Sequence, residues 1–212
     1  MAQAAGASAR ASAVASVPGA GPEPEPPPAL TDRLFFAVVP DAAAIAEIKL
    51  LTASLRTRHG LRGRPLADAK LHATLCFLGG FPGVPAGMVA HAGQAAARVA
   101  AATQEFEVAF DAAQSFVNRA RHRPFVLTGG DGAAHLKALY KNLAQALLEV
   151  GIASGSRSYT PHITLLYDDL AVVPEPVPAI RWTVRELVLL HSRIGQNQPS
   201  YSELARWRLS IQ

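Results

Sequence analysis

The spacing of apolar residues along the chain predicts a mixture of strands and helices. Short apolar runs bounded by turn-forming residues are typical of strands, and an apolar residue every three or four positions is typical of a helix. After Asp41, a favourable first residue for a helix, Ile45 and Ile48 begin such a helical stripe. The predicted helices span residues 42–58, 85–102 and 133–150. The predicted strands span residues 33–39, 71–78, 105–111, 123–128, 161–167, 185–192 and 201–209. This mixture indicates an α/β or an α+β fold.

The first 30 residues lack this pattern. They are rich in Ala and Ser, end in a Pro/Glu-rich stretch and offer few large side chains to bury. A signal or transit peptide is the competing interpretation, but the segment has no compact Leu/Val-rich core, and Arg10 is its single basic residue. We therefore predict a disordered tail over residues 1–30 and a single domain over residues 31–212.

Composition narrows the class of protein without deciding its function. The 212 residues are 50% hydrophobic, as expected of a globular protein. The single cysteine, Cys76, excludes an intrachain disulfide and a Cys-based zinc cluster, and it fits a reducing compartment such as the cytoplasm. No apolar run reaches the ~18 residues that a membrane span requires. The formal charge of +4 permits a polyanionic partner such as RNA.

An internal repeat divides the predicted domain into two lobes. The segment that begins Arg33-Leu-Phe can be superposed on the one that begins Arg123-Pro-Phe, 90 residues later. The same offset carries His72-Ala-Thr-Leu onto His162-Ile-Thr-Leu. Two matches in one register predict two equivalent lobes related by a pseudo-twofold axis, each contributing one His-x-Thr strand.

The two His-x-Thr strands are the best candidates for chemistry. Side chains alternate along a strand, so His72 and Thr74 share one face, as do His162 and Thr164. A pseudo-twofold axis would bring both pairs together across a cleft. Histidine titrates near pH 6.5, so two imidazoles can supply an acid and a base to an in-line displacement at phosphorus. The same alternation places Cys76 near the cleft, but no oxyanion loop supports a nucleophilic role for this thiol.

Both motifs resemble those of a known family. His72-Ala-Thr-Leu75, followed by Phe77-Leu-Gly, and Pro161-His-Ile-Thr-Leu165 are similar to the paired motifs of the two-histidine (2H) phosphoesterases. The branch that the chain resembles most is that of the RNA 2′,3′-cyclic phosphodiesterases, also known as LigT-like 2′-5′ RNA ligases. The opening strand and the closing segment also resemble this branch, so the similarity covers about residues 33–209.

The resemblance implies a bilobal α+β fold with antiparallel-rich sheets around a central cleft and helices outside. It also implies hydrolysis of a 2′,3′-cyclic phosphate to a 2′-phosphate with no metal or other cofactor, and reversible ATP-independent joining of 2′-5′ linkages. By analogy His72 is the proton donor and His162 the proton acceptor, while Thr74 and Thr164 bind phosphoryl oxygens. The implied substrate is RNA with a cyclic phosphate end, tRNA halves being one candidate, and we expect a monomer with no membrane partner.

One position departs from this branch. An Arg often follows the second His-x-Thr-Leu by two residues, and here that position is Tyr167. We name Arg193 or Arg64 as the substitute phosphate ligand and Phe36 as a surface on which a base could stack, with a core position as the alternative for Phe36. Two other functions stay open: a 2H phosphoesterase for a small cyclic nucleotide, and a non-catalytic RNA-binding module.

Overall fold

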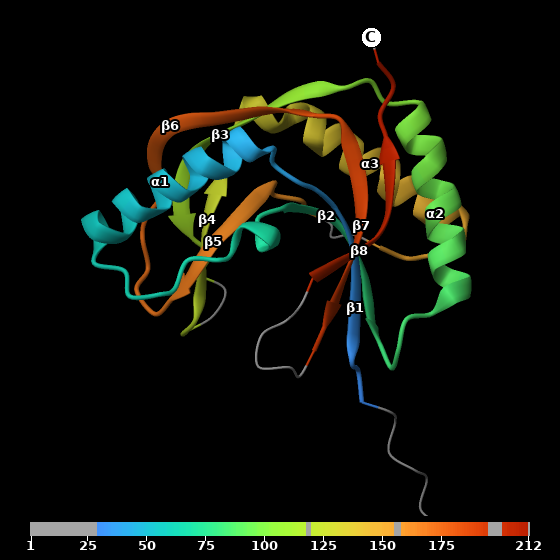
Figure 1. Ribbon diagram of the computed structural model, residues 1–212, viewed down its shortest axis with the longest axis horizontal. Helices are drawn as coiled ribbons and strands as arrows, with labels where there is room; N and C mark the ends of the chain where they lie inside the picture. The colour runs from blue at the N-terminus through green and yellow to red at the C-terminus, as the bar shows by residue number, and fades with distance from the viewer. Residues whose placement is uncertain (1–28, 118–119, 155–157, 195–200, 212) are drawn as a thin grey trace, which may run out of the picture.

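The fold is built on a sheet of eight strands with three helices packed against it (Figure 1). The structure, a computed structural model, describes residues 29–117, 120–154, 158–194 and 201–211. Nearly all of the predicted tail therefore lies outside the described residues. The strands are β1 (Asp32–Val38), β2 (Ala73–Phe81), β3 (Phe106–Ser115), β4 (Arg123–Thr128), β5 (His162–Asp168), β6 (Glu175–Val184), β7 (Glu186–Arg193) and β8 (Tyr201–Arg208).

The order of the strands reveals two matching halves. The sheet runs β6-β3-β4-β5-β2-β1-β7-β8, and every pair of neighbours is antiparallel. Reading outward from the centre, β5, β4, β3 and β6 correspond to β2, β1, β7 and β8. The halves are joined through one residue pair, Ala73 with Ile163. The predicted bilobal α+β architecture is confirmed.

The three helices form close to where the apolar stripes predict them. They are α1 (Ala42–His59), α2 (Ala86–Ala101) and α3 (Ala134–Glu149). At the start of α1, the Asp41 carboxylate accepts a hydrogen bond from the Ala44 N–H, and Gly60 ends the helix with a φ of 64°. α1 packs against β6, whereas α2 packs against β7 and β8. The third helix, α3, packs against α2, β3 and the central strand β2.

One strand was missing from the sequence prediction. β6 carries Pro176 and Pro178, and prolines in an apolar run argue against a strand because they donate no hydrogen bond. β6 pairs with β3 alone, so it is an edge strand, where a missing donor can face away from the ladder. Its exposed position explains why the local pattern was too weak to predict it.

Candidate active site

The two His-x-Thr motifs meet where the halves of the sheet join. Because Ala73 and Ile163 are antiparallel partners, His72 lies opposite Thr164, and Thr74 lies opposite His162. Side chains directly opposed in such a pair have Cβ atoms about 4.5–5.5 Å apart, and diagonal neighbours about 7–8 Å. Ala73 and Ile163 are buried, while the His and Thr side chains are partly exposed. Two imidazoles and two hydroxyls therefore share one face, as the alternation predicts.

The hydrogen bonds of the two imidazoles are equivalent. Nδ1 of His72 lies 2.8 Å from the carbonyl oxygen of Lys70, and Nδ1 of His162 lies 2.8 Å from that of Thr160. A carbonyl can only accept, so each Nδ1 carries the hydrogen and Nε2 is the basic nitrogen of the neutral ring. Nε2 of His72 is also 3.1 Å from the Thr74 hydroxyl. Both rings thus present the same nitrogen for proton transfer.

Aromatic side chains surround each histidine. The centroid of the Phe35 ring is 5.0 Å from that of His72, and the Tyr201 ring meets His72 edge-on at 5.5 Å. Phe116 meets His162 edge-on at 5.0 Å. Burial lowers the pKa of His72 to about 4, and the neighbouring His162 contributes to this lowering. Burial also lowers the pKa of His162, so both rings are neutral at pH 7 in the free protein.

A β-bulge in β2 changes the predicted position of Cys76. Thr74 pairs with Ala37, but Phe77 pairs with Phe35, so two residues of β2 oppose a single residue of β1. Cys76 is fully buried, and Phe77 is 50% exposed. The prediction that Cys76 shares a face with Thr74 is wrong, because it assumed an unbroken ladder. Burial raises the pKa of the Cys76 thiol to about 11, which keeps it protonated in the core.

An equivalent bulge in β5 brings Tyr167 to the cleft. Val126 pairs with Thr164 and the preceding Phe125 pairs with Leu166, so β5 also has one extra residue after its motif. Beyond the bulge Leu166 is buried and Tyr167 is partly exposed. Tyr167 therefore continues the face of Thr164, at the position where related proteins often carry an arginine.

The prediction for Phe36 is wrong. Its side chain is fully buried and its ring packs 5.8 Å from that of Trp207, so no base can stack on it. The neighbouring Phe35 faces the site and contacts His72. The apolar run of β1 is buried on both sides, so it has no polar alternation that would reveal which face looks into the cleft.

Arg193 also lies apart from the histidines. On β7, Val188 and Leu190 pack with Phe35 on the cleft face, whereas Leu189 packs into the main core on the other face. Alternation places Arg193 with Leu189, so the arginine leaves the sheet on the side away from the cleft. The structure does not bring this predicted phosphate ligand to the site.

Arg64, the other basic candidate, lies beside β5. The N–H of Leu66 donates to the carbonyl of Leu165 at 2.8 Å. Gly63 lies so close to β5 that a Cβ there would be 2.1 Å from the carbonyl oxygen of Tyr167. The segment that carries Arg64 therefore runs along β5 just past the second motif, and the Arg64 side chain is exposed.

Comparison with known proteins identifies the family. Residues 38–196 match the family model described as the 2′-5′ RNA ligase superfamily. The chain belongs to this superfamily. The chain is 30% identical over 199 residues to the RNA 2′,3′-cyclic phosphodiesterase of Escherichia coli K12. This match covers 84% of the chain and 97% of the E. coli protein. The protein of the same name from Geobacillus stearothermophilus is also 30% identical, over 65% of this chain and 45% of that one.

Solved structures of the superfamily share this fold. E. coli LigT in its apo form has a TM-score of 0.68 and 27% identity, covering 86% of this chain and 99% of that one. LigT complexed with 3′-AMP has a TM-score of 0.66 and 28% identity, with the same coverage. The resemblance to the 2H phosphoesterases is confirmed.

On the His162 side of this superfamily site lies an aromatic cavity of about 770 Å³. Phe77, Phe116 and Tyr159 line it together with Thr74 and His162. Its size and apolar lining are those of a small-molecule pocket with a few polar groups at one end. The sequence does not reveal this cavity, because Phe77 reaches it through the bulge and Phe116 lies beyond the predicted end of its strand.

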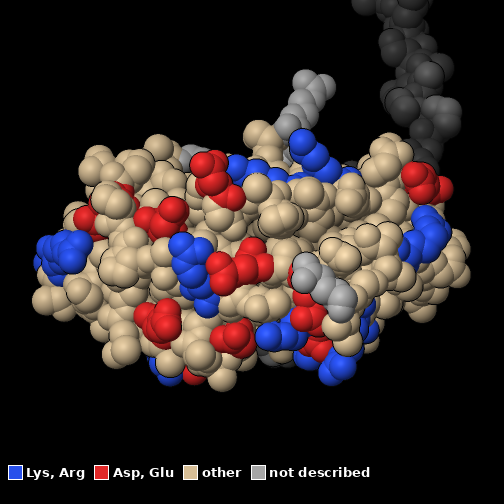
Figure 2. All heavy atoms as spheres, turned by 90° about the horizontal axis from the view of Figure 1, so that it is seen from above, with Lys and Arg blue, Asp and Glu red and all other residues tan. Residues whose placement is uncertain are grey.

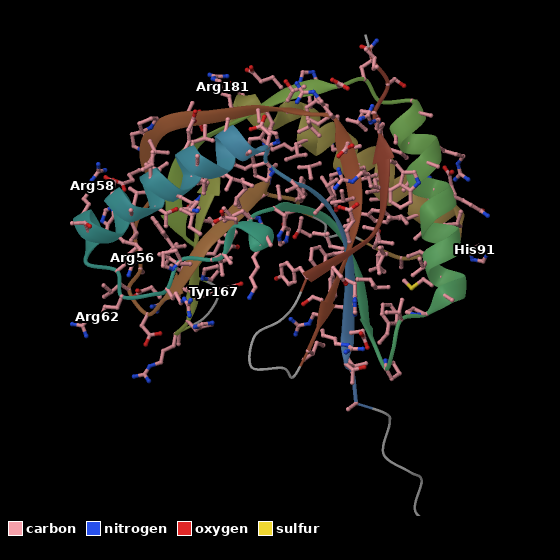
Figure 3. All side chains as sticks on the ribbon, in the orientation of Figure 1. Arg56, Arg58, Arg62, His91, Tyr167 and Arg181 are labelled. Carbon is pink, nitrogen blue, oxygen red and sulfur yellow. The ribbon has the colours of Figure 1, made fainter. Side chains whose placement is uncertain are left out.

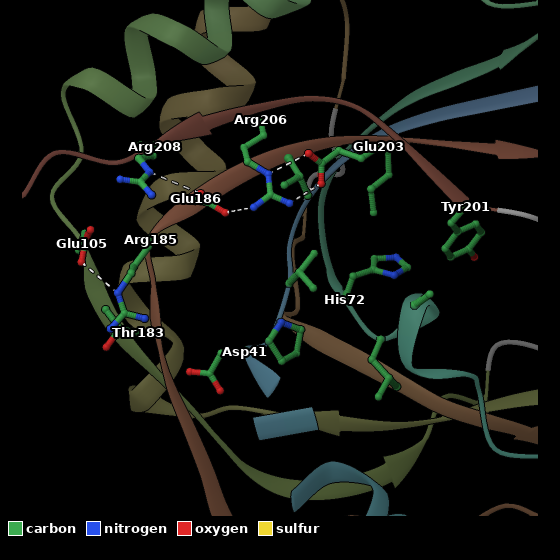
Figure 4. A pocket seen from close by; sticks show the side chains of 16 residues that line it. Asp41, His72, Glu105, Thr183, Arg185, Glu186, Tyr201, Glu203, Arg206 and Arg208 are labelled. Carbon is green, nitrogen blue, oxygen red and sulfur yellow. Dashed lines mark hydrogen bonds and ion pairs between the residues drawn. The ribbon is translucent and has the colours of Figure 1, made fainter. Parts of the chain in front are cut away.

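On the His72 side lies a charged cavity of about 600 Å³ (Figure 4). Its three arginines are bound to glutamates, and the ion pairs are drawn as dashed lines in Figure 4. The pairs are Arg185 with Glu105, Arg206 with Glu186 and Glu203, and Arg208 with Glu186. The positive charge of these three arginines is therefore already neutralised by glutamates of the protein.

Two further properties concern metals and membranes. Within the described ranges, no cluster of three or more His, Cys, Asp or Glu side chains could hold a metal ion. No helix in this part of the chain is long and apolar enough to cross a membrane.

Proposed function

We propose that the protein is an RNA 2′,3′-cyclic phosphodiesterase that uses His72 and His162 as its acid and base. The observation that carries the proposal is the pairing of two equivalent imidazoles and two hydroxyls across the junction of the sheet. The names of the E. coli and Geobacillus relatives support the same activity.

In the proposed reaction, Nε2 of His162 takes a proton from a water molecule whose oxygen bonds to phosphorus. The bond from phosphorus to the 3′-oxygen breaks, and that oxygen takes a proton from Nε2 of His72. The product carries a 2′-phosphate and a 3′-hydroxyl, and proton exchange with solvent restores both rings. Thr74 and Thr164 donate hydrogen bonds to the non-bridging oxygens. An RNA 5′-hydroxyl in place of water gives a 2′-5′ linkage without ATP.

The pKa values of the two histidines indicate how one ring of the pair becomes protonated. Both are lowered by burial, and the reaction needs one protonated and one neutral ring. A bound phosphodiester is an anion beside both rings, so it raises their pKa values and favours protonation of one of them. Binding of the substrate thus helps to supply the proton that the leaving oxygen takes.

The aromatic cavity beside His162 is proposed to hold the base of the terminal nucleotide. Phe77 and Phe116 offer faces and edges for a ring, and LigT has been crystallised with 3′-AMP. A small cyclic nucleotide fits the same cavity and is the second candidate substrate. We further propose that the protein acts as a cytoplasmic monomer on RNA ends such as those of cleaved tRNA.

The test is hydrolysis of an oligonucleotide with a 2′,3′-cyclic phosphate end in the presence of EDTA, with the 2′-phosphate product identified by mass spectrometry. His72→Ala and His162→Ala should each reduce the rate at least ~100-fold, the lower end of general acid–base effects. His91→Ala is the matched control, because His91 is exposed on α2, away from the site (Figure 3). Circular dichroism of each variant checks its folding.

Four outcomes would contradict this proposal. Near wild-type turnover by either folded variant would exclude the two-histidine mechanism. Loss of activity in EDTA would point to a metal. Binding of RNA with no turnover of either the oligonucleotide or a cyclic mononucleotide would favour the non-catalytic module, and turnover of the mononucleotide alone would favour the small-molecule enzyme.

A further inference from the structure

Beyond the second motif, the cleft face continues into an aromatic stack. The rings of Tyr167 and His122 lie face to face, with centroids 4.5 Å apart and planes 7° apart. Tyr167 lies on the same face of β5 as Thr164, three residues further along the strand. The stack therefore begins beside the second His-x-Thr motif and leads away from it.

The partner ring of this stack is held by a specific backbone conformation. His122 has a φ of 53°, in the left-handed region that residues other than glycine seldom adopt. Its N–H donates to the carboxylate of Asp169 at 2.8 Å, and Arg123 donates to the carbonyl of Asp169. His122 is nevertheless exposed, so this conformation presents the ring to solvent rather than burying it.

Two arginines flank the stack. Arg62 lines the same cavity as His122 and Tyr167, and Arg121 directly precedes His122. Both side chains are exposed, and neither forms an ion pair with any residue that the structure describes. Figure 3 shows Arg62 and Tyr167 on the same side of the molecule, below α1.

Two carboxylates, those of Asp168 and Asp169, line this cavity, and both accept hydrogen bonds from backbone N–H groups. Asp168 is buried and accepts the backbone N–H groups of Arg62 and Gly63 at 2.6 and 2.7 Å. Glu175 binds Arg58 and His59. The flanking arginine side chains thus remain available for an anion from outside the protein.

This arrangement contrasts with that of the charged cavity on the His72 side. On the His72 side, the arginines of the charged cavity are neutralised by glutamates (Figure 4). On the face seen in Figure 2, basic and acidic side chains are interspersed. A polyanion that leaves the catalytic pair therefore meets unpaired positive charge in the direction of the stack.

We infer that the surface formed by Tyr167, His122, Arg62 and Arg121 binds the single-stranded RNA on the 5′ side of the terminal nucleotide. A nucleotide with a 2′,3′-cyclic phosphate is at a 3′ end, so the rest of the RNA extends from it in the 5′ direction alone. A base stacks on the Tyr167–His122 platform, and the arginines bind the backbone phosphates. The inference rests on the proposed function, because it assumes that the cyclic phosphate lies at the histidine pair.

The test compares two substrates, a cyclic mononucleotide and a single-stranded hexanucleotide with a cyclic phosphate end. The double variant Arg62→Gln/Arg121→Gln should lower kcat/KM for the hexanucleotide about tenfold. A plot of the logarithm of the binding constant against the logarithm of the salt concentration should also become less steep by about 1.4, since each lost phosphate contact contributes about 0.7 to the slope. The mononucleotide should be hydrolysed within about twofold of wild type. His122→Ala should likewise lower kcat/KM for the hexanucleotide alone.

The control is Arg98→Gln/Arg181→Gln, which removes the same charge from two exposed arginines, on α2 and β6, that are paired with Glu149 and Glu107. Figure 3 labels Arg181, far from Tyr167. The control should leave both substrates unaffected. An equal loss on both substrates, or no loss on the hexanucleotide, would overturn the inference.

A binding measurement separates this inference from the proposed function. Fluorescence anisotropy with a hexanucleotide ending in a 2′-phosphate requires no turnover. If neither substrate is hydrolysed, the proposed function fails, while weaker binding by the arginine double variant would still support an RNA-binding surface. Equally tight binding of duplex RNA by the wild-type protein would overturn the assignment to a single strand.

Discussion

The buried histidine of the first motif predicts a loss of stability in mild acid. The pKa of His72 is lowered to about 4 by burial, whereas an unfolded chain has a histidine pKa of about 6.5. Between these values the unfolded chain takes up a proton that the folded protein does not, so stability falls as the pH is lowered. At about 1.36 kcal/mol per pKa unit, this one side chain makes the protein about 2 kcal/mol less stable at pH 5 than at pH 7.

The perturbation is His72→Gln, which removes the titrating group and keeps a polar side chain. Urea unfolding at pH 7 and pH 5 gives the loss of stability for each protein, and the wild type should lose about 2 kcal/mol more than the variant. Acidic groups such as Asp32 and Asp168, whose pKa values are lowered, contribute equally to both proteins. The control His91→Gln, at an exposed site, should lose as much as the wild type. An equal loss in wild type and His72→Gln would refute the lowered pKa, as would an NMR titration of His72 near pH 6.5.

Three further predictions follow from the same geometry. Because the active form has one protonated and one neutral ring, and the pKa values of His72 and His162 are both lowered, kcat/KM should be bell-shaped with a maximum below pH 6.5; a maximum above pH 7 would contradict this. Cys76 should react with a thiol reagent at pH 8 only after unfolding, since it is fully buried with a pKa of about 11, and rapid labelling of the native protein would place it at the surface. Gly63→Ala should destabilise the protein by about 1–3 kcal/mol in urea unfolding, because its Cβ would meet the Tyr167 carbonyl oxygen at 2.1 Å, and an unchanged midpoint would mean that the two segments separate easily.

The sequence predicts the elements and the symmetry of the site well. The helices begin and end within a few residues of the apolar stripes, and the 90-residue repeat corresponds to two halves with matching strand order. The repeat extends to details that the sequence does not reveal, since both histidines donate to a carbonyl two residues earlier. Local patterns suffice here because the helices and motif strands are formed from continuous segments of chain.

The errors arose where the contacts are not local. A bulge depends on how a strand pairs with its neighbour, so alternation alone wrongly predicts that Cys76 lies in the cleft. The choice between Phe35 and Phe36 depends on which face of β1 packs into the main core, and the apolar run over residues 34–38 carries no sign of this. Arg193 belongs to the closing segment, which resembles that of the family. This resemblance does not show on which face of β7 an exposed side chain lies.

The two halves of the sheet differ in how the chain builds them. The half with His162 is formed by one continuous stretch, from β3 to β6, whereas the half with His72 needs β1 and β2 from one end of the chain and β7 and β8 from the other. During synthesis the continuous half can fold while the ribosome is still adding the last strands. The half of the sheet that contains β2, which follows His72, cannot be completed until β7 and β8 have emerged from the ribosome. A translation product that stops before β7 therefore contains both histidines but lacks the strands that hold the first one in place, and we expect such a fragment not to hydrolyse cyclic phosphate ends.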